Sequence, residues 1–292
     1  MKPGAFKYFA PTTMEEAVGL LGLYGPEAKI LAGGQSLMPL LNMRLARPSV
    51  IVDINRIGEM DYIRPSDGGI AIGALTRERR VEDDPIVAER LPLLAALVKW
   101  IGHPQIRNRG TVCGSIAHGD PAAELPAAAL ALDAELAVVG KSGTRTLSPD
   151  DLYLGYLATS LAPDEIIREV RFPGLPANAG WSIQEVARRH GDFALVGVIA
   201  VLGLTEGRIS EARLVCFGVG GRPVRFPEIE GQLVGSTPSE DLFSATARQV
   251  SASVDPDGDI HASAAYRKEV AGVLTRRALE QASERAKGGI QS

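Results

Sequence analysis

The sequence contains very little cysteine: Cys113 and Cys216 are its only two, and they lie far apart. They form no Cys-x-x-Cys pair, so the chain alone offers no cysteine set for an iron–sulfur cluster or a cysteine-rich zinc site. Its four histidines share no metal-ligand spacing. We therefore predict no metal site in this chain. So sparse a use of cysteine fits a reducing compartment, and we expect a cytoplasmic protein.

The sequence also lacks a long hydrophobic run and a block of one charge. Its longest apolar stretches, such as 196–204, fall far short of the roughly 20 residues that a membrane helix needs. The N-terminus has neither the apolar segment nor the cleavage site of a secretory signal. Lysine and arginine are scattered among carboxylates, and the net charge is −4. We expect no membrane span and no nucleic-acid partner.

Familiar catalytic and nucleotide-binding motifs are missing as well. Ser36 and Ser142 have no accompanying His/Asp arrangement, so nucleophilic catalysis has no support. Asp53 follows the Gly-Gly pair by about the interval of a Rossmann fingerprint, but the G-x-G-x-x-G spacing is absent. No P-loop occurs either. We interpret Asp53 as a structural residue.

The composition that remains is that of a globular protein with a sizeable core. Hydrophobic residues make up 45% and charged residues 23% of the 292 residues, a length that fits two or three compact units. The first 57 residues predict strands over 6–9, 29–32 and 50–54. Helices are predicted from Thr13, with Glu16 at capping-box spacing, and over 37–45. This alternation indicates a small parallel sheet covered by helices.

The next segment, 58–175, has a different pattern. We expect a strand over 69–74, a cap at Thr76, and a helix over 85–100 that is interrupted near Pro92. Asp120 has the position of an N-cap, with proline at the first helical position after it. A hairpin over 134–147 and a strand over 165–172 complete this segment.

A Pro/Gly stretch at 173–180 is the best candidate for a domain boundary. Antiparallel strands over 181–188, 194–204 and 209–219 follow, and then helices over 239–253 and 262–287. The predicted class is α+β. Two lobes occupy 1–57 and 58–175, and a C-terminal domain with an antiparallel sheet and helices occupies 176–292.

Two loops are candidates for a cofactor site. In the first, a strand runs into Gly33 and Gly34, and Ser36 then stands at the N-cap of a helix. Glycines let the backbone approach a ligand, and the free N–H groups favour an anion such as a pyrophosphate. A plain strand-to-helix turn explains this loop equally well.

The second loop, 105–126, is rich in turn residues and polar side chains. Thr111 and Ser115 offer hydroxyl groups, Gly110 and Gly114 allow close backbone approach, and further on come the carboxylates Asp120 and Glu124. A capped helix after a surface loop is the competing interpretation.

Together the loops resemble a known family. AGGQSLMPLL from Ala32 and RNRGTVCGSIAHGDPAAELPAA from Arg107 are similar to the paired FAD-binding signatures of the medium subunit of molybdenum hydroxylases. That family includes carbon monoxide dehydrogenases and the xanthine dehydrogenase group. The resemblance continues through TSLAPDE at 159–165 and ARRHGDFALV at 187–196, and covers nearly the whole chain.

The resemblance implies a two-lobed FAD-binding domain of the vanillyl-alcohol-oxidase type followed by a smaller α+β domain. It places the pyrophosphate at 32–36 and 111–115, the adenosine side at Glu124 and, more weakly, Asp120, and the flavin at Leu161 and Phe193. The FAD-binding residues that it implies are Leu31, Ala32, Gly33, Gly34, Gln35, Ser36, Leu37, Ile101, Thr111, Gly114, Ser115, Asp120, Glu124, Leu161, Gln184 and Phe193.

This sequence departs from the family pattern at two positions. Cys113 replaces the first glycine of Thr-x-Gly-Gly, which would be strained if that position requires positive φ. Gln184 stands where many members carry a lysine near the flavin, so a positive charge is missing there.

The implied function is electron transfer within a larger enzyme. Electrons would pass from a large molybdopterin subunit through 2Fe–2S clusters of a small subunit to FAD on this chain, and then to an external acceptor, in a dimer of heterotrimers. Two alternatives stay open: a free-standing FAD-dependent oxidoreductase, and a flavin-free scaffold subunit.

Overall fold

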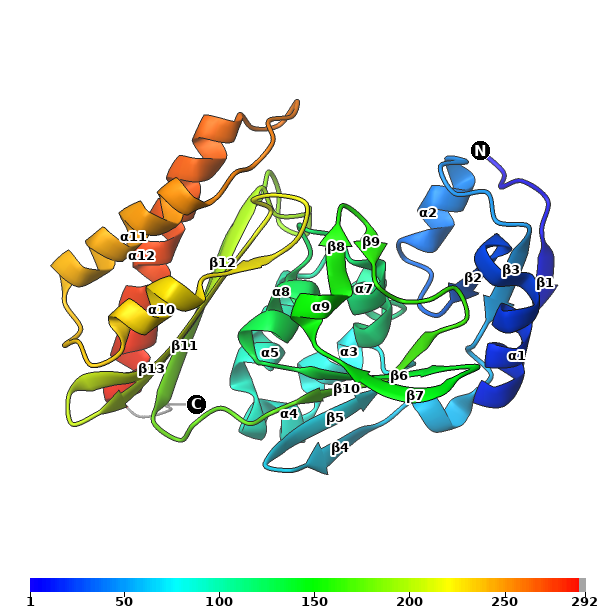
Figure 1. The fold of residues 1–292 in the computed structure, drawn as a ribbon, viewed down its shortest axis with the longest axis horizontal. Coiled ribbons are helices and arrows are strands. Elements are labelled where there is room, and N and C mark those ends of the chain that lie inside the picture. Colours follow the sequence, from blue (N-terminus) through cyan, green and yellow to red (C-terminus); the bar gives the residue numbers. More distant parts are fainter. Residues whose placement is uncertain (289–292) are drawn as a thin grey trace.

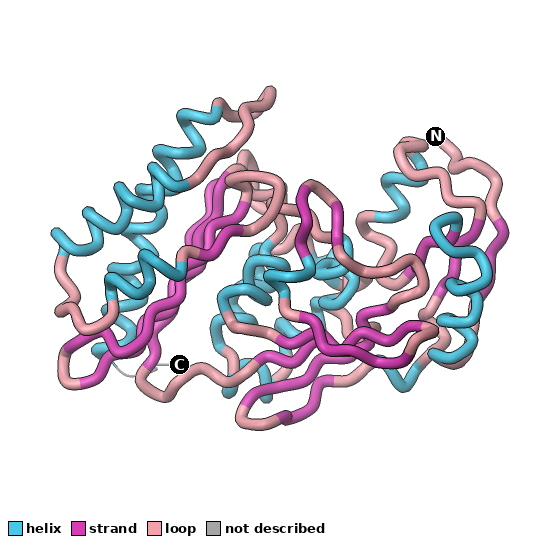
Figure 2. The backbone as a smooth tube through the Cα atoms, in the orientation of Figure 1, coloured by secondary structure: helices cyan, strands magenta, loops and turns pink. Residues whose placement is uncertain are grey.

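Three principal β-sheets lie in a row along the long axis of the molecule (Figure 1). The structure is a computed structural model that describes residues 1–288. Helices and strands are mixed throughout, and most of the strand pairs outside the first sheet are antiparallel (Figure 2). The predicted α+β class is confirmed.

The N-terminal sheet is parallel, as predicted, with the strand order β1-β3-β2. Its central strand is the apolar run Val-Ile-Val, which is buried on both sides. Thr13 caps the first helix, since its Oγ1 accepts the N–H of Glu16 at 3.1 Å. The elements of this sheet and its helices are β1 (Lys7–Phe9), α1 (Met14–Tyr24), η1 (Gly25–Glu27), β2 (Ala28–Leu31), α2 (Leu37–Asn42) and β3 (Val50–Asp53).

The central sheet has five antiparallel strands in the order β4-β5-β10-β6-β7. They are β4 (Ile63–Ser66), β5 (Gly69–Gly73), β6 (Glu135–Gly140), β7 (Gly143–Leu147) and β10 (Ile166–Phe172). Around them lie η2 (Gly58–Met60), α3 (Glu78–Asp83), α4 (Pro85–Arg90), α5 (Pro92–Leu97), η3 (Val98–Trp100), α6 (Pro104–Arg107), α7 (Val112–His118), α8 (Glu124–Ala131), α9 (Pro149–Leu152) and the hairpin β8 (Tyr153–Gly155) with β9 (Ala158–Thr159).

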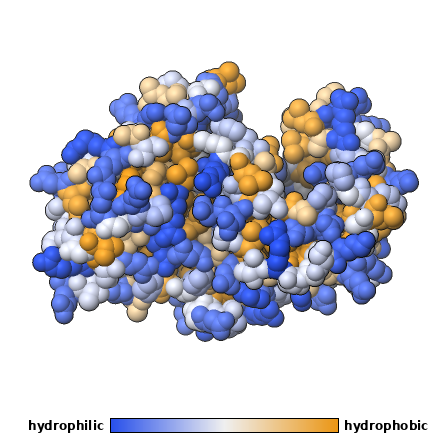
Figure 3. Space-filling view, in the orientation of Figure 1, coloured by the Kyte–Doolittle hydropathy of each residue, from blue (hydrophilic) through white to orange (hydrophobic). Residues whose placement is uncertain are grey.

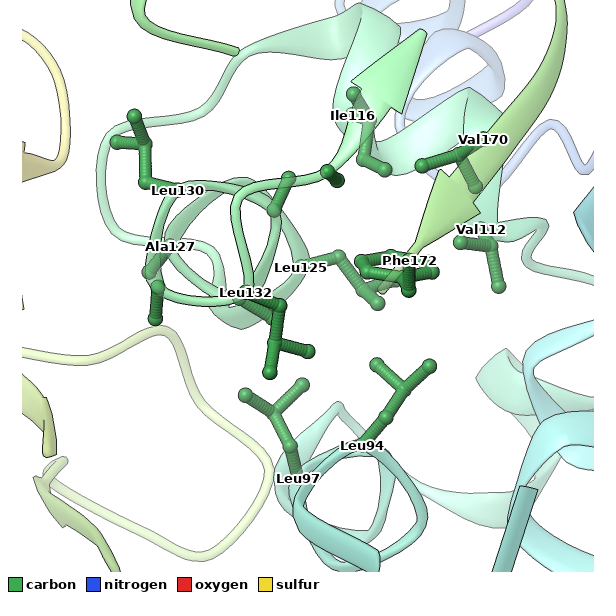
Figure 4. Close-up of a cluster of buried hydrophobic side chains, with 14 of the residues drawn as sticks. Leu94, Leu97, Val112, Ile116, Leu125, Ala127, Leu130, Leu132, Val170 and Phe172 are labelled. Atoms are coloured by element: carbon green, nitrogen blue, oxygen red, sulfur yellow. The ribbon is translucent and has the colours of Figure 1, made fainter. Parts of the chain in front are cut away.

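The core of this region forms where α5, α7 and α8 pack against β10. Figure 4 shows Leu125 of α8 beside Phe172 of β10, with Leu94 and Leu97 approaching from α5. Every residue of α8 is buried. This packing fixes the direction of α7, whose N-terminus carries the second candidate loop.

Three local predictions are wrong here. The segment 105–126 is largely helical, because Thr111 Oγ1 accepts the N–H of Gly114 at 3.2 Å and so starts α7. Asp120 does not cap α8, whose N-cap is Ala123; its carboxylate accepts the N–H of Ala122 in a turn instead. Thr76 does not cap α3, because its hydroxyl is buried and exchanges hydrogen bonds with the backbone of Tyr62.

The C-terminal sheet is antiparallel in chain order, with strands β11 (Ala179–Val186), β12 (Val196–Thr205), β13 (Arg208–Phe217) and β14 (Val224–Arg225). Its outer face is covered by α10 (Pro227–Leu233), α11 (Glu240–Ser253) and α12 (Ala264–Gly288) (Figure 1). Its inner face packs against α5 and α8 of the central region. The side-chain alternation of β11 therefore decides which residues face the two candidate loops.

Within residues 1–288, no helix is both long and apolar enough to cross a membrane.

Candidate functional site

The two candidate loops touch each other. A Cβ atom added to Gly33 would lie 2.5 Å from the carbonyl oxygen of Arg109, 2.8 Å from Cα of Gly110 and 3.0 Å from the nitrogen of Thr111. Gly114 also lies near, since its own added Cβ would be 3.9 Å from Cβ of Ala32. The contact between the two loops therefore requires glycine at position 33. The sequence analysis described the two loops separately and did not predict this contact.

A hydrogen-bond network holds the loops in this arrangement. Arg77 donates to the carbonyl of Arg109 and, at 2.6 Å, to Oδ1 of Asn55. Asn55 in turn donates to the carbonyl of Ala32 at 2.8 Å. The guanidinium of Arg77 thus bridges the first and second loops through a single amide side chain.

Asp53 holds Asn55, one member of this network, in place. Its carboxylate accepts hydrogen bonds from the backbone and side-chain N–H groups of Asn55, at 2.9 and 2.6 Å, and from the hydroxyl of Tyr8 at 2.6 Å. These contacts fix the orientation of Asn55. The interpretation of Asp53 as a structural residue agrees with them.

The first loop offers backbone donors that the protein itself does not use. Among the described residues, the N–H groups of Gly34, Gln35 and Ser36 have no acceptor within the chain. Gly34 has φ +76°, a conformation that turns the chain sharply and favours glycine. Ser36 begins α2 without a side-chain cap, so its hydroxyl is also available. Such a loop suits a phosphate or pyrophosphate group.

Cys113 does not introduce backbone strain. It lies in the first turn of α7, is buried, and is not among the residues with positive φ. Burial raises the pKa of its thiol to about 12, so the group stays protonated and unreactive. The strain expected for a non-glycine residue at this position is therefore absent.

The far end of α7 brings a second group of predicted residues together. α7 ends at Gly119, which is in the left-handed conformation; a Cβ added there would meet Thr159 of the hairpin, and Leu161 follows two residues on. Gly191 lies against the backbone of Gly102, next to Ile101, and so anchors the loop that carries Phe193. Phe193 is exposed.

This loop borders a cavity of about 690 Å³. Pro121 and Ala122 line one side of the cavity, and Phe193, Arg188 and His261 line another. Asp120 and Glu124 flank these lining residues, which places them at the end of α7 that also holds Leu161 and Phe193. Figure 3 shows a different hollow in the surface, between the region of α2 and the hairpin β8–β9, with hydrophobic side chains nearby.

Three carboxyl groups around α7 are removed from solvent, and the sequence analysis named only one of them: Glu78 and Glu124 are buried, and Glu185 is half-buried. Glu78 lies against Gly110, before the start of α7. Burial raises the pKa of Glu124 to about 7, and the charge of Asp120 adds to the rise. Burial and then the charge of Glu124 raise the pKa values of Glu78 and Glu185, both to about 8. Glu78 Oε2 and Glu185 Oε2 have no hydrogen-bond partner among the described residues. Unpaired buried carboxyls of this kind are typical of functional sites.

Gln184 is the one predicted residue that the structure turns away from the others. Its side chain donates to Ser182 Oγ and to Gln281 Oε1, both at 3.1 Å, on the sheet face that packs against α12. Glu185, its neighbour, points to the opposite face. The missing charge at position 184 is therefore on the wrong side of β11 to act directly on this site.

The residues that the sequence analysis missed are Asn55, Arg77, Glu78 and Glu185. Asn55 carried a usable signal, since it follows the carboxyl end of a strand next to the one that ends at Leu31. Arg77 and Glu78 begin a short helix without a side-chain cap and gave no comparable signal.

Comparison with protein families gives two matches that together span most of the chain. Residues 4–175 match the FAD binding domain in molybdopterin dehydrogenase. Residues 181–282 match the CO dehydrogenase flavoprotein C-terminal domain.

Individual relatives agree with these matches. The chain is 43% identical to the 6-hydroxypseudooxynicotine dehydrogenase complex subunit alpha of Paenarthrobacter nicotinovorans, over 98% of this chain and 97% of that protein. It is 38% identical to the carbon monoxide dehydrogenase medium chain of Hydrogenophaga pseudoflava, over 97% and 98%.

Solved structures are equally similar. A chain of carbon monoxide dehydrogenase from Hydrogenophaga pseudoflava superposes with a TM-score of 0.95 at 39% identity, covering 98% of this chain and 99% of that one. A chain of quinoline 2-oxidoreductase from Pseudomonas putida 86 gives 0.93 at 36% identity, with the same coverage.

Proposed function

The chain belongs to the family of FAD-binding subunits of molybdopterin dehydrogenases, and from this premise we propose which of its residues hold FAD and how the complex is built. As a member, it is the FAD-binding medium subunit of a multi-subunit molybdenum hydroxylase and acts in electron transfer. FAD, when bound, supplies the redox chemistry, and the protein positions it.

The pyrophosphate of FAD binds where the two loops meet. The unused N–H groups of Gly34, Gln35 and Ser36 are the observation that carries this assignment. They lie on a loop that is held against Gly110 and Thr111 by the network of Arg77 and Asn55. Leu31, Ala32 and Leu37 frame the first loop, and Gly114 and Ser115 the second.

The flavin half of FAD lies toward the other end of α7. Leu161, Phe193 and Ile101 supply apolar contacts there, and Asp120 and Glu124 supply carboxyl groups. The meeting of Gly119 with Thr159 and of Gly191 with Gly102 supports this grouping. It moves Glu124 from the adenosine side, where the sequence resemblance put it, to the flavin side. We leave Gln184 out of the site because it faces α12.

The rest of the complex follows the family pattern. A large partner holds molybdopterin and a small partner holds 2Fe–2S clusters, and two such heterotrimers form a dimer. The domain division is 1–57, 58–175 and 176–292, so that every domain contains a single principal sheet. The two free, buried cysteines support a cytoplasmic location.

FAD binding by the full chain tests the site directly. Gly34→Leu places a bulky side chain on a residue with φ +76° whose added Cβ would already lie 3.1 Å from Cδ1 of Leu31. We expect this variant to lose FAD while its C-terminal sheet stays folded, measured by flavin absorbance and circular dichroism. Gly231→Leu, at an open position in α10, is the matched control. Stoichiometric FAD in Gly34→Leu would contradict the assignment.

A further inference from the structure

On the inner face of the C-terminal sheet, Glu185, Gly197 and Phe217 lie side by side on three neighbouring strands, and Glu185 is the one residue of this row with a carboxyl group. Glu185 of β11 is paired with Gly197 of β12, which is paired with Phe217 of β13. Residues directly opposite each other in antiparallel strands point to the same face. Phe217 belongs to the buried core between this sheet and the central region, so Glu185 faces the same way.

Gly197 shapes the surroundings of Glu185. A Cβ added to Gly197 would lie 2.0 Å from Cζ of Phe217, so the aromatic ring occupies the space above the glycine. The ring therefore fills the middle of the row and lies toward Glu185. Ile183, two residues earlier in β11, is buried on the same face.

This row adjoins the end of α7 that we assign to the flavin. Gly218, directly after Phe217, donates its N–H to the carbonyl of Pro121 at 2.8 Å. The loop that carries Phe193 leaves β11 just after Glu185 and returns through the hydrogen bond from Leu195 N–H to the carbonyl of Val186. Glu185 is thus bracketed by the Asp120–Glu124 turn on one side and the Phe193 loop on the other.

One oxygen of the half-buried Glu185 carboxyl lacks a partner among the described residues. Its Oε2 is inaccessible to solvent and has no hydrogen-bond partner. The charge that acts on Glu185 is that of Glu124 from α8, and it disfavours a second negative charge there. Glu124 is in turn affected by the charge of Asp120. Glu78 is affected by Glu124, which raises its pKa, and by Arg107 of α6, which lowers it. An inaccessible carboxyl oxygen without a hydrogen-bond partner costs stability, and Oε2 of this half-buried residue is therefore open to a partner that the protein alone does not supply.

We propose that Glu185 contacts the flavin half of bound FAD through a protonated carboxyl group that donates a hydrogen bond to an acceptor atom of the cofactor. The inference rests on the proposed function, because it places FAD along α7. A neutral acid suits this position, since a carboxylate would face both Glu124 and the negatively charged cofactor. Burial, with Glu124 adding to it, raises the pKa of Glu185 to about 8, so the donor is present at neutral pH.

The test compares FAD dissociation constants of full-chain variants at pH 6 and pH 9. Wild type should bind FAD more weakly at pH 9, because ionised Glu185 has lost its proton and repels the ligand. Glu185→Gln keeps an N–H donor and does not titrate, so its affinity should match wild type at pH 6 and fall less at pH 9. Glu185→Ala should bind about fivefold to tenfold more weakly at pH 6, as expected for one lost hydrogen bond.

Glu206→Gln is the matched control, since it removes an exposed carboxyl from the β12–β13 turn at the opposite end of the same sheet. It should reproduce wild type at both pH values. The pH dependence that remains in Glu185→Gln reports Glu124 and Glu78, whose pKa values are also raised.

Two results would overturn the inference: a pH response of Glu185→Gln equal to that of wild type, or wild-type affinity in Glu185→Ala at pH 6. If Glu185→Ala fails to fold, the Gln variant still decides the question. Failure of the proposed function is distinguishable, because Gly34→Leu would then also retain FAD.

Discussion

Replacing Gly33 by alanine tests the contact between the two loops at a single atom. The added Cβ would approach three backbone atoms of the segment Arg109–Thr111 within 2.5–3.0 Å. Backbone atoms cannot rotate away as a side chain does, so the loops must separate. Overpacking of this kind costs about 1–3 kcal/mol. If FAD binds only when the loops are in contact, that cost appears as a dissociation constant about 5- to 150-fold higher.

Two assays on the full chain separate the consequences. Thermal unfolding measures the strain in the free protein, and fluorescence titration with FAD measures the loss of affinity. Gly19→Ala is the control: Gly19 lies inside α1, an added Cβ there meets nothing within 4 Å, and alanine should stabilise the helix by about 0.5–1 kcal/mol. Gly33→Ala with wild-type stability and wild-type FAD affinity would refute the reasoning.

Three further predictions concern side chains around the same site. Thr111→Ala removes the cap of α7, in which Oγ1 accepts the N–H of Gly114, and should destabilise the chain by about 1 kcal/mol in urea unfolding, whereas Thr111→Ser should recover most of that loss. Cys113→Gly restores the family residue but deletes a buried side chain inside a helix. It should lower the free energy of unfolding by about 2 kcal/mol and leave the FAD affinity unchanged. Tighter FAD binding by this variant would show that the cysteine does impair the loop. Burial raises the pKa of Glu78 from 4.5 to about 8, so the folded state holds a proton that the unfolded state releases, and this one group makes stability fall as pH rises through that window by at most about 1.4 kcal/mol per pH unit. Glu78→Gln should remove this share of the fall and leave the shares of Glu124 and Glu185, whose pKa values are also raised, and an unchanged pH profile would exclude Glu78 as a source.

Most of the fold could be predicted because local signals and tertiary structure agree. The parallel N-terminal sheet follows from short apolar runs separated by helices, and Thr13 caps its helix as the Thr-x-x-Glu spacing indicates. The interruption near Pro92 is also observed, since α4 ends at Arg90 and α5 begins at Pro92. In each case the physical cause lies within a few residues of the effect.

The predictions that failed concern residues whose partners are distant in the sequence. Thr76 has the side chain of an N-cap, but the backbone of Tyr62, the residue before β4, exchanges hydrogen bonds with its hydroxyl instead. Asp120 and Pro121 resemble a helix start, but Pro121 accepts the N–H of Gly218, which keeps this segment in a turn. Neither partner can be identified from local spacing.

The candidate site likewise has a part that could be predicted from local sequence and a part that could not. The glycines and hydroxyl residues of the two loops could be identified from the sequence, because each loop has its own signature. That Gly33 packs against the backbone of Arg109 could not, since the contact joins two lobes. Whether Gln184 or Glu185 faces the site depends on which alternate residues of β11 point inward. The sequence does not decide this, because apolar residues occur in both alternating sets, at Ile183 and Val186.

The subunit, flavin and metal content of the native complex tests the central claim most directly. We predict one FAD for each copy of this chain, with molybdenum and iron recovered only in association with two other polypeptides, a large one and a small one. A native complex without flavin would contradict the claim that the chain is an FAD-binding subunit. A flavin-containing chain that purifies alone and reduces a substrate of its own would contradict the claim that it works within a larger enzyme.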